Sequence, residues 1–216
     1  MAVKPGRSPG GWARSPRYAI LVPEARLDGH TITIAYATHR LETLPEADAW
    51  MRHHDAIVLE EPPDEDLDAV LDGRMEAADY PALLDAQFPR FSRRLCEVLR
   101  EHRCRGAEVL QVDPFLEVLA GIHELFEHGG LPADIDPRSL QGQVYAAERA
   151  WTAALLDYYE ASADACFETI IDKVKTFAGK DARRGLLRDE LRAAAVAKLV
   201  DAHPTLYVET GSAHWV

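Results

Sequence analysis

Four short apolar runs in the chain each lead to side chains that can transfer protons or bind a metal. Residues 32–37 lead to His39, 56–59 to Glu60, 107–112 to Asp113, and 205–208 to Glu209 and His214. If these runs are parallel strands of one sheet, their carboxyl ends lie along the edge where ligands bind in open α/β sheets. The pattern therefore predicts a site built from both halves of the chain.

His39, Glu60 and His214 are the candidate catalytic groups of this site. A neutral imidazole is a general base or a metal ligand near neutral pH, and a carboxylate can orient it, act as base or bind a cation. The same three residues are candidate metal ligands, and a histidine and carboxylate set suits Mn²⁺, Co²⁺ or Zn²⁺. Glu42 or Glu209 is expected to orient these groups or to transfer a proton.

Arg188 is the candidate for stabilising a developing oxyanion, and Arg149 and Asp113 are candidates for orienting the catalytic groups. Each candidate also has a structural explanation. Asp113 precedes Pro114 and suits a helix N-cap, the arginines suit surface ion pairs on a helix, and Glu60 suits a solvated acidic loop. Histidines near a chain terminus are ordinarily surface residues.

The order of elements favours a mixed, mainly parallel α/β sheet covered by helices, with a long helical segment in the second half of the chain. A strand at 205–208 suits a central position, because helices within 138–202 supply the long crossover. A strand pair at 18–22 and 31–37 is expected around Asp28-Gly29. Residues 45–53 read as a short helix.

Four further stretches read as helix or loop. Residues 64–72 are acidic and predict a solvated helix or loop, and 81–102 predict a helix that is kinked or broken at Pro89. Residues 113–129 predict a helix capped by Asp113 and ended by Gly129. Asp181 is expected to cap a last helix that runs to residue 202.

The longest periodic segment is 140–178, which would be a helix of about 60 Å if it were straight. It is expected either to bend near residues 161–165 or to project and pair with a partner, as in a homodimer. The triplet Gly179-Lys180-Asp181 is expected to break the helix.

The 216 residues carry a net charge of −12, which argues against a nucleic-acid partner. Residues 1–17 are basic and poor in apolar groups, which predicts a disordered arm ahead of a single domain over 18–216 with a helical insertion at 138–202. No secretory signal and no run of about 18 apolar residues is seen, so no membrane partner is expected. An odd number of cysteines suits reduced thiols in the cytoplasm.

Five short motifs resemble those of the TraB, ChaN and Tiki superfamily, to which erythromycin-esterase-like proteins are related. They are YATH at 36–39, VLEEPP at 58–63, ER at 148–149, LLRDELR at 186–192 and the GxxH motif GSAH at 211–214. Tyr36 stands where that superfamily usually has glycine. The resemblance implies an α/β fold in which His39 and His214 face one cleft. It also implies metal-dependent peptidase, metal-free esterase or haem-binding activity.

Three functions are therefore expected from the sequence. The first is a cytoplasmic hydrolase that acts on a small-molecule or peptide substrate, with or without a divalent metal. The second is a non-catalytic module that binds a small ligand or haem in the same cleft. The third is an interaction protein that forms a homodimer through the helix at 140–178.

Overall fold

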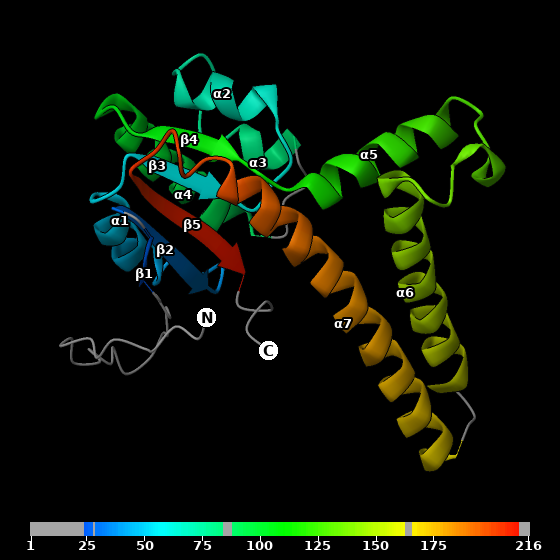
Figure 1. The fold of residues 1–216 in the computed structure, drawn as a ribbon. Helices are drawn as coiled ribbons and strands as arrows, with labels where there is room; N and C mark the ends of the chain where they lie inside the picture. Colours follow the sequence, from blue (N-terminus) through cyan, green and yellow to red (C-terminus); the bar gives the residue numbers. More distant parts are fainter. Residues whose placement is uncertain (1–23, 28, 84–87, 163–165, 212–216) are drawn as a thin grey trace.

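A five-stranded sheet forms the centre of the molecule, in the order β1-β2-β5-β3-β4 (Figure 1). The computed structural model describes residues 24–27, 29–83, 88–162 and 166–211. The strands are β1 (Glu24–Leu27), β2 (His30–Ala37), β3 (Ala56–Leu59), β4 (Glu108–Gln111) and β5 (Thr205–Gly211). β2, β5, β3 and β4 are parallel neighbours, and β1 is antiparallel at the edge. The mixed, mainly parallel α/β fold is thus confirmed.

The position of β5 between β2 and β3 confirms the prediction of a central last strand. All four predicted strand ends lie at one edge, because the four strands are parallel. β1 turns into β2 at Gly29, whose φ of +92° suits a residue without a Cβ. The first strand of this pair, β1, starts at Glu24. The predicted strand at 18–22 and the predicted arm at 1–17 lie outside the described residues.

Helices cover both faces of the sheet. They are α1 (Leu44–Met51), α2 (Glu65–Leu71), α3 (Tyr80–Leu83), α4 (Pro89–Cys104), α5 (Pro114–Glu127), α6 (Leu140–Ser162) and α7 (Phe167–Ala197), with a 3₁₀ turn at Pro132–Asp134. The end of α7 packs on one face through Val196, while α1, α2 and α4 pack on the other. Because side chains alternate along β5, Leu206 and Val208 face α7. Tyr207 therefore faces the core shared with α4, and Glu209 lies on that same face.

Local chemistry explains where two helices start and how a third packs. α4 begins at Pro89, so the predicted break is confirmed at that residue. Asp113 caps α5, since its Oδ1 accepts a hydrogen bond from the Leu116 N–H at 3.0 Å. Residues 64–72 contain α2, whose side chains at Leu67 and Val70 are buried. The acidic residues of α2 are solvated, but its apolar face packs in the core.

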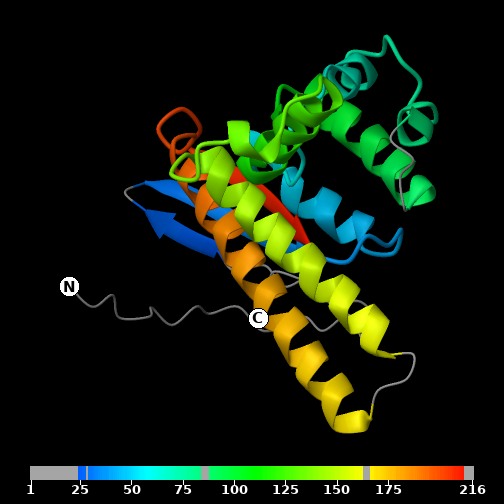
Figure 2. The same ribbon diagram turned by 90° about the vertical axis from the view of Figure 1, so that its right-hand side faces the viewer.

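α6 and α7 form a long antiparallel hairpin that extends away from the sheet (Figures 1 and 2). The chain reverses between Ser162 and Phe167, where the sequence predicted a bend. The predicted break at Gly179–Asp181 is wrong, because α7 is continuous over 31 residues. The predicted helix from Asp181 to residue 202 is the second half of α7, which ends at Ala197.

The continuity of α7 has a packing explanation. A glycine inside a helix costs only about 1 kcal/mol relative to alanine. On either side of Gly179, α7 makes contacts with α6 that outweigh this cost. Phe177 packs against Trp151 with ring centroids 6.2 Å apart, and the Arg184 guanidinium lies 5.1 Å from the Trp151 ring. Within the described part of the chain, no helix is long and apolar enough to cross a bilayer.

Candidate active site

A cavity of about 330 Å³ opens at the carboxyl edge of the sheet. Its polar side is formed by residues at or just after the ends of β2, β3 and β5, together with one arginine of α7: His39, Glu60, Glu61, Glu209, Gly211 and Arg188. The rest of its lining is mostly apolar and comes from β3, α2, α3 and α4: Leu59, Leu67, Tyr80, Phe91, Ser92, Leu95, Cys96 and Leu99. The cavity therefore joins charged groups to an apolar surface, as small-molecule sites commonly do.

Arg188 connects two carboxylates beside the cavity. Its Nε donates to Asp113 Oδ2 at 2.7 Å, its Nη2 donates to the same oxygen, and Nη2 also lies 2.9 Å from Glu60 Oε1. Asp113 is fully buried, so its charge needs this compensation. The N-cap role of Asp113 and its ion pair are made through different oxygens, and the residue therefore serves both.

Glu60 holds the ends of β3 and β5 together. Its Oε2 accepts hydrogen bonds from the Gly211 backbone N–H at 2.7 Å and from Thr210 Oγ1 at 3.1 Å. Arg192 Nη1 lies 3.8 Å from the same oxygen, and the Arg192 Nε donates to the Val112 carbonyl. Both oxygens of Glu60 are thus already engaged by donors from β5 and α7.

These contacts bear on the predicted metal set of His39, Glu60 and His214. A metal ion at Glu60 would share the carboxylate oxygens with the donors that already bond them. No group of three candidate ligands occurs among the described residues. His214 lies outside them, so the metal set of His39, Glu60 and His214 stays a prediction.

Glu209 is the least compensated acid of the cavity. It is 8% exposed, and its carboxylate accepts no hydrogen bond from any residue that the structure describes. Burial, together with the charges of Glu61 and Glu60, raises the pKa of Glu209 to about 7 against the lowering effect of Arg192. A carboxyl group of this pKa exchanges a proton readily at neutral pH.

Glu61 is a second acid on the same cavity, and its side chain is half-buried. Burial raises its pKa, while a hydrogen bond from Gln111 Nε2 to Glu61 Oε2, 3.2 Å long, opposes the shift. The structure places Glu61 on the cavity, although the sequence pattern did not select this residue. The sequence signal for this placement is weak: Glu61 is the second residue after the buried strand β3.

His39 and Cys96 complete the reactive groups. The exposed His39 imidazole stacks on Phe91 of α4, with centroids 5.0 Å apart and planes at 19°, and meets Phe88 edge-on. Burial raises the pKa of the Cys96 thiol to about 12, so it is a neutral thiol rather than a nucleophile. His39 therefore lies at the rim, next to the aromatic wall.

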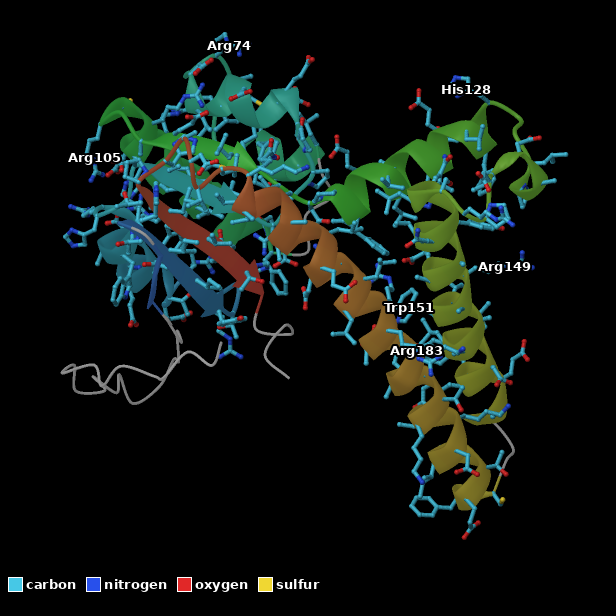
Figure 3. The ribbon with its side chains drawn as sticks, in the orientation of Figure 1. Arg74, Arg105, His128, Arg149, Trp151 and Arg183 are labelled. Atoms are coloured by element: carbon cyan, nitrogen blue, oxygen red, sulfur yellow. The ribbon has the colours of Figure 1, made fainter. Side chains whose placement is uncertain are left out.

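Four predicted residues line this one cavity: His39, Glu60, Arg188 and Glu209. Asp113 is one hydrogen bond away from it. Glu42 is exposed and Arg149 projects from the outer side of α6, where its Nη1 lies 3.5 Å from Tyr145 Oη (Figure 3); neither lines the cavity. The apolar wall from α4 was not predicted, because helical periodicity identifies a buried face but not what it faces.

The chain is similar to an uncharacterized protein of Archaeoglobus fulgidus. The two sequences are 31% identical over 181 residues, which cover 84% of this chain and 60% of the archaeal protein. The chain thus spans about 60% of the length of that relative. No family profile and no solved structure matches the chain.

Proposed function

We propose that this protein is a hydrolase of the TraB and ChaN-like type, with the cavity at the sheet edge as its active site. The proposal depends mainly on one observation: Glu209, a buried carboxyl group without a bonded donor among the described residues, lines a cavity together with Arg188. The presence of His39 and Glu60 on the same cavity supports the resemblance from which the family was inferred.

Glu209 is the general base of the proposed reaction. Its carboxylate takes a proton from water as the water oxygen bonds to the carbonyl carbon of an ester or amide. The protonated Glu209 then returns that proton to the leaving alcohol or amine as the bond to carbon breaks. A pKa of about 7 suits both transfers at neutral pH.

Arg188 is the proposed electrophilic group. Its Nε and Nη2 are bonded to Asp113 and Glu60, which fixes the plane of the guanidinium. No acceptor among the described residues bonds Nη1, so this group is available to the substrate carbonyl oxygen. Donors that are held in place before reaction stabilise a developing oxyanion. Glu60 and Asp113 act as positioning residues, and His39 is proposed to contact the substrate at the rim.

The experiment measures turnover of ester, peptide and phosphoester substrates by the wild-type protein and by Glu209→Gln. We expect kcat/KM to fall by about 10² or more in the variant, since this is the usual contribution of a general base. Glu127→Gln, an exposed acid on α5, is the matched control and should keep full activity. Equal turnover by Glu209→Gln and the wild-type protein would remove the proposal.

Two further measurements separate the alternatives for this cavity. Turnover after chelation and after addition of Mn²⁺, Co²⁺ or Zn²⁺ separates metal-dependent from metal-independent hydrolysis. A Soret band on addition of hemin, without turnover of any substrate, would favour the haem-binding module instead.

We propose a second role for the α6–α7 hairpin, as the contact between two copies of the chain. Leu156, Tyr159 and Phe167 are 55%, 60% and 70% exposed on the half of the hairpin that is distant from the sheet. Two paired helices bury only one stripe of each, and a second hairpin would cover the remaining apolar side chains in a four-helix bundle. Light scattering across a dilution series tests this homodimer.

A further inference from the structure

We propose that the cavity binds a ligand that carries an organic ammonium group on an apolar body, with the ammonium held between Glu61 and Glu209. The inference rests on the proposed function in one respect, because it takes the occupant of the cavity to be the substrate. Binding itself does not require turnover and is measured separately.

The first observation is the charge balance around the cavity. The acidic groups around the cavity outnumber the basic ones. The carboxylates are those of Glu60, Glu61, Asp113 and Glu209, and the guanidinium groups are those of Arg188 and Arg192. Arg188 pairs with Asp113 and Glu60.

The donors of Arg192 are also committed. Its Nε and Nη2 donate to the Val112 and Glu209 backbone carbonyls, and Nη1 approaches Glu60. Glu61 and Glu209 are therefore left without an ion-pair partner among the described residues. Ionisation of both would leave the cavity with an excess of negative charge, which a cationic ligand would neutralise.

The second observation is independent of the charge count and concerns the Glu209 side chain itself. Glu209 is more than nine-tenths buried and lines the cavity, yet no described donor bonds its carboxylate. A carboxyl group that is largely removed from bulk solvent is stabilised by a donor inside the cavity. A ligand N–H donor in the cavity would satisfy it, and an ammonium group supplies three such donors.

The apolar wall indicates that the cation is organic. Phe91, Tyr80, Leu95 and Leu99 line the same cavity as the acids. Hydrated inorganic ions are poorly accommodated by such a wall, whereas an alkyl or aromatic body buries its surface there. Aromatic rings also attract cations through their faces. The volume of about 330 Å³ suits one small molecule.

A bound cation also fits the proposed chemistry. A positive charge beside Glu209 favours the carboxylate over the carboxylic acid. The general base would then be ionised when the substrate is bound and largely protonated in the empty cavity at lower pH. Substrate binding would in this way prepare the base for the reaction.

The test is calorimetric titration at about pH 8 with three probes that share one aromatic body: 2-phenylethylamine, 2-phenylethanol and phenylacetate. We expect the amine to bind at least about 10-fold more tightly than the alcohol, and phenylacetate to bind most weakly. Glu61→Gln and Glu209→Gln should each weaken amine binding by about 10-fold and leave the alcohol unchanged. Glu127→Gln should change neither.

The alcohol serves as the folding control, because its unchanged affinity shows that the cavity of each variant is intact. Amine binding that is absent, no tighter than that of the alcohol, or unaffected in both acid variants would overturn the inference. Selective amine binding without any hydrolysis would overturn the proposed function and leave the inference standing. Hydrolysis of neutral esters without preference for amines would overturn the inference and leave the proposed function standing.

Discussion

Arg188 on α7 and Asp113 at the start of α5 are joined by two hydrogen bonds from one guanidinium to one carboxylate oxygen, across 75 positions of sequence. The same guanidinium reaches Glu60 at the end of β3. The pair therefore connects the second half of α7 to the edge of the sheet that carries the cavity. It fixes the orientation of Arg188 before any ligand arrives.

Removal of this cation should be strongly destabilising. Arg188→Met leaves the buried Asp113 without its ion-pair partner and removes one of the two arginines near Glu60, and breaking a buried pair typically costs about 3–5 kcal/mol. Urea unfolding measures the change. Arg183→Met, at an exposed position of the same helix, is the control and should stay within about 0.5 kcal/mol of wild type. The double variant Arg188→Met/Asp113→Asn should recover part of the loss, and no recovery would mean that the two residues are not coupled.

The stability of the protein should fall as pH rises past the range in which free glutamate ionises. The pKa of Glu209 is about 7 in the folded protein, above the ordinary value of 4.5, so the folded state holds a proton that the unfolded chain has released. Glu209 makes its full contribution to the free energy of unfolding below about pH 4.5. That contribution decreases as pH rises to about 7, by roughly 3 kcal/mol in total. Urea unfolding across this window should show the slope in the wild-type protein.

Glu209→Gln removes that titration and should flatten the slope, so the variant should be the more stable protein at about pH 8. Glu127→Gln should keep the wild-type slope. Activity should respond in the opposite sense, because the general base works as the carboxylate. The kcat/KM of the wild-type protein should therefore rise through about pH 7. A wild-type slope retained in Glu209→Gln would show that other groups cause it.

Two glycines of the hairpin should respond differently to alanine. At Gly142, in the first turn of α6, a Cβ would lie 2.2 Å from the Asp136 carbonyl oxygen and 2.7 Å from Pro137 Cα, so backbone must move. At Gly179, inside α7, nothing lies within 4 Å of the added atom. We expect Gly142→Ala to lower the melting temperature and Gly179→Ala to raise stability by about 0.5–1 kcal/mol. Thermal unfolding of both variants decides the point.

The homodimer should depend on the exposed apolar residues of the hairpin. Leu156→Glu places a charge where the second copy would bury an apolar side chain, and each chain of the dimer carries the change. The dissociation constant should rise by at least about 10-fold. Leu131→Glu, at a 62% exposed position before α6, should leave it unchanged. A monomer at all concentrations in the wild-type protein would end this proposal.

The sequence predicted best those features that depend on near neighbours. Asp113-Pro114 identified both a helix start and its cap, and the four apolar runs identified strands whose ends converge. The break at Gly179 was predicted wrongly because the contact between Phe177 and Trp151 joins residues of two helices, and local propensity does not contain it. Tertiary packing overrides helix propensity in such cases.

The composition of the cavity was predicted in part for the same reason. His39, Glu60 and Glu209 follow or end strands, so their convergence followed from a parallel sheet. Glu61 was not predicted as a cavity residue, because the contacts that hold it there come from distant segments, such as the hydrogen bond from Gln111. Its partners lie about 30 to 50 positions away, and a single sequence does not pair them.

The central place of β5 has a consequence for how the chain folds during synthesis. The β1–β2 pair and the β3–β4 pair are made early, yet neither touches the other in the finished sheet except through residues 205–211. A growing polypeptide must therefore hold two separate half-sheets with unpaired edges until β5 leaves the ribosome. Such edges invite association with other chains, so chaperone engagement should be greatest just before that strand emerges.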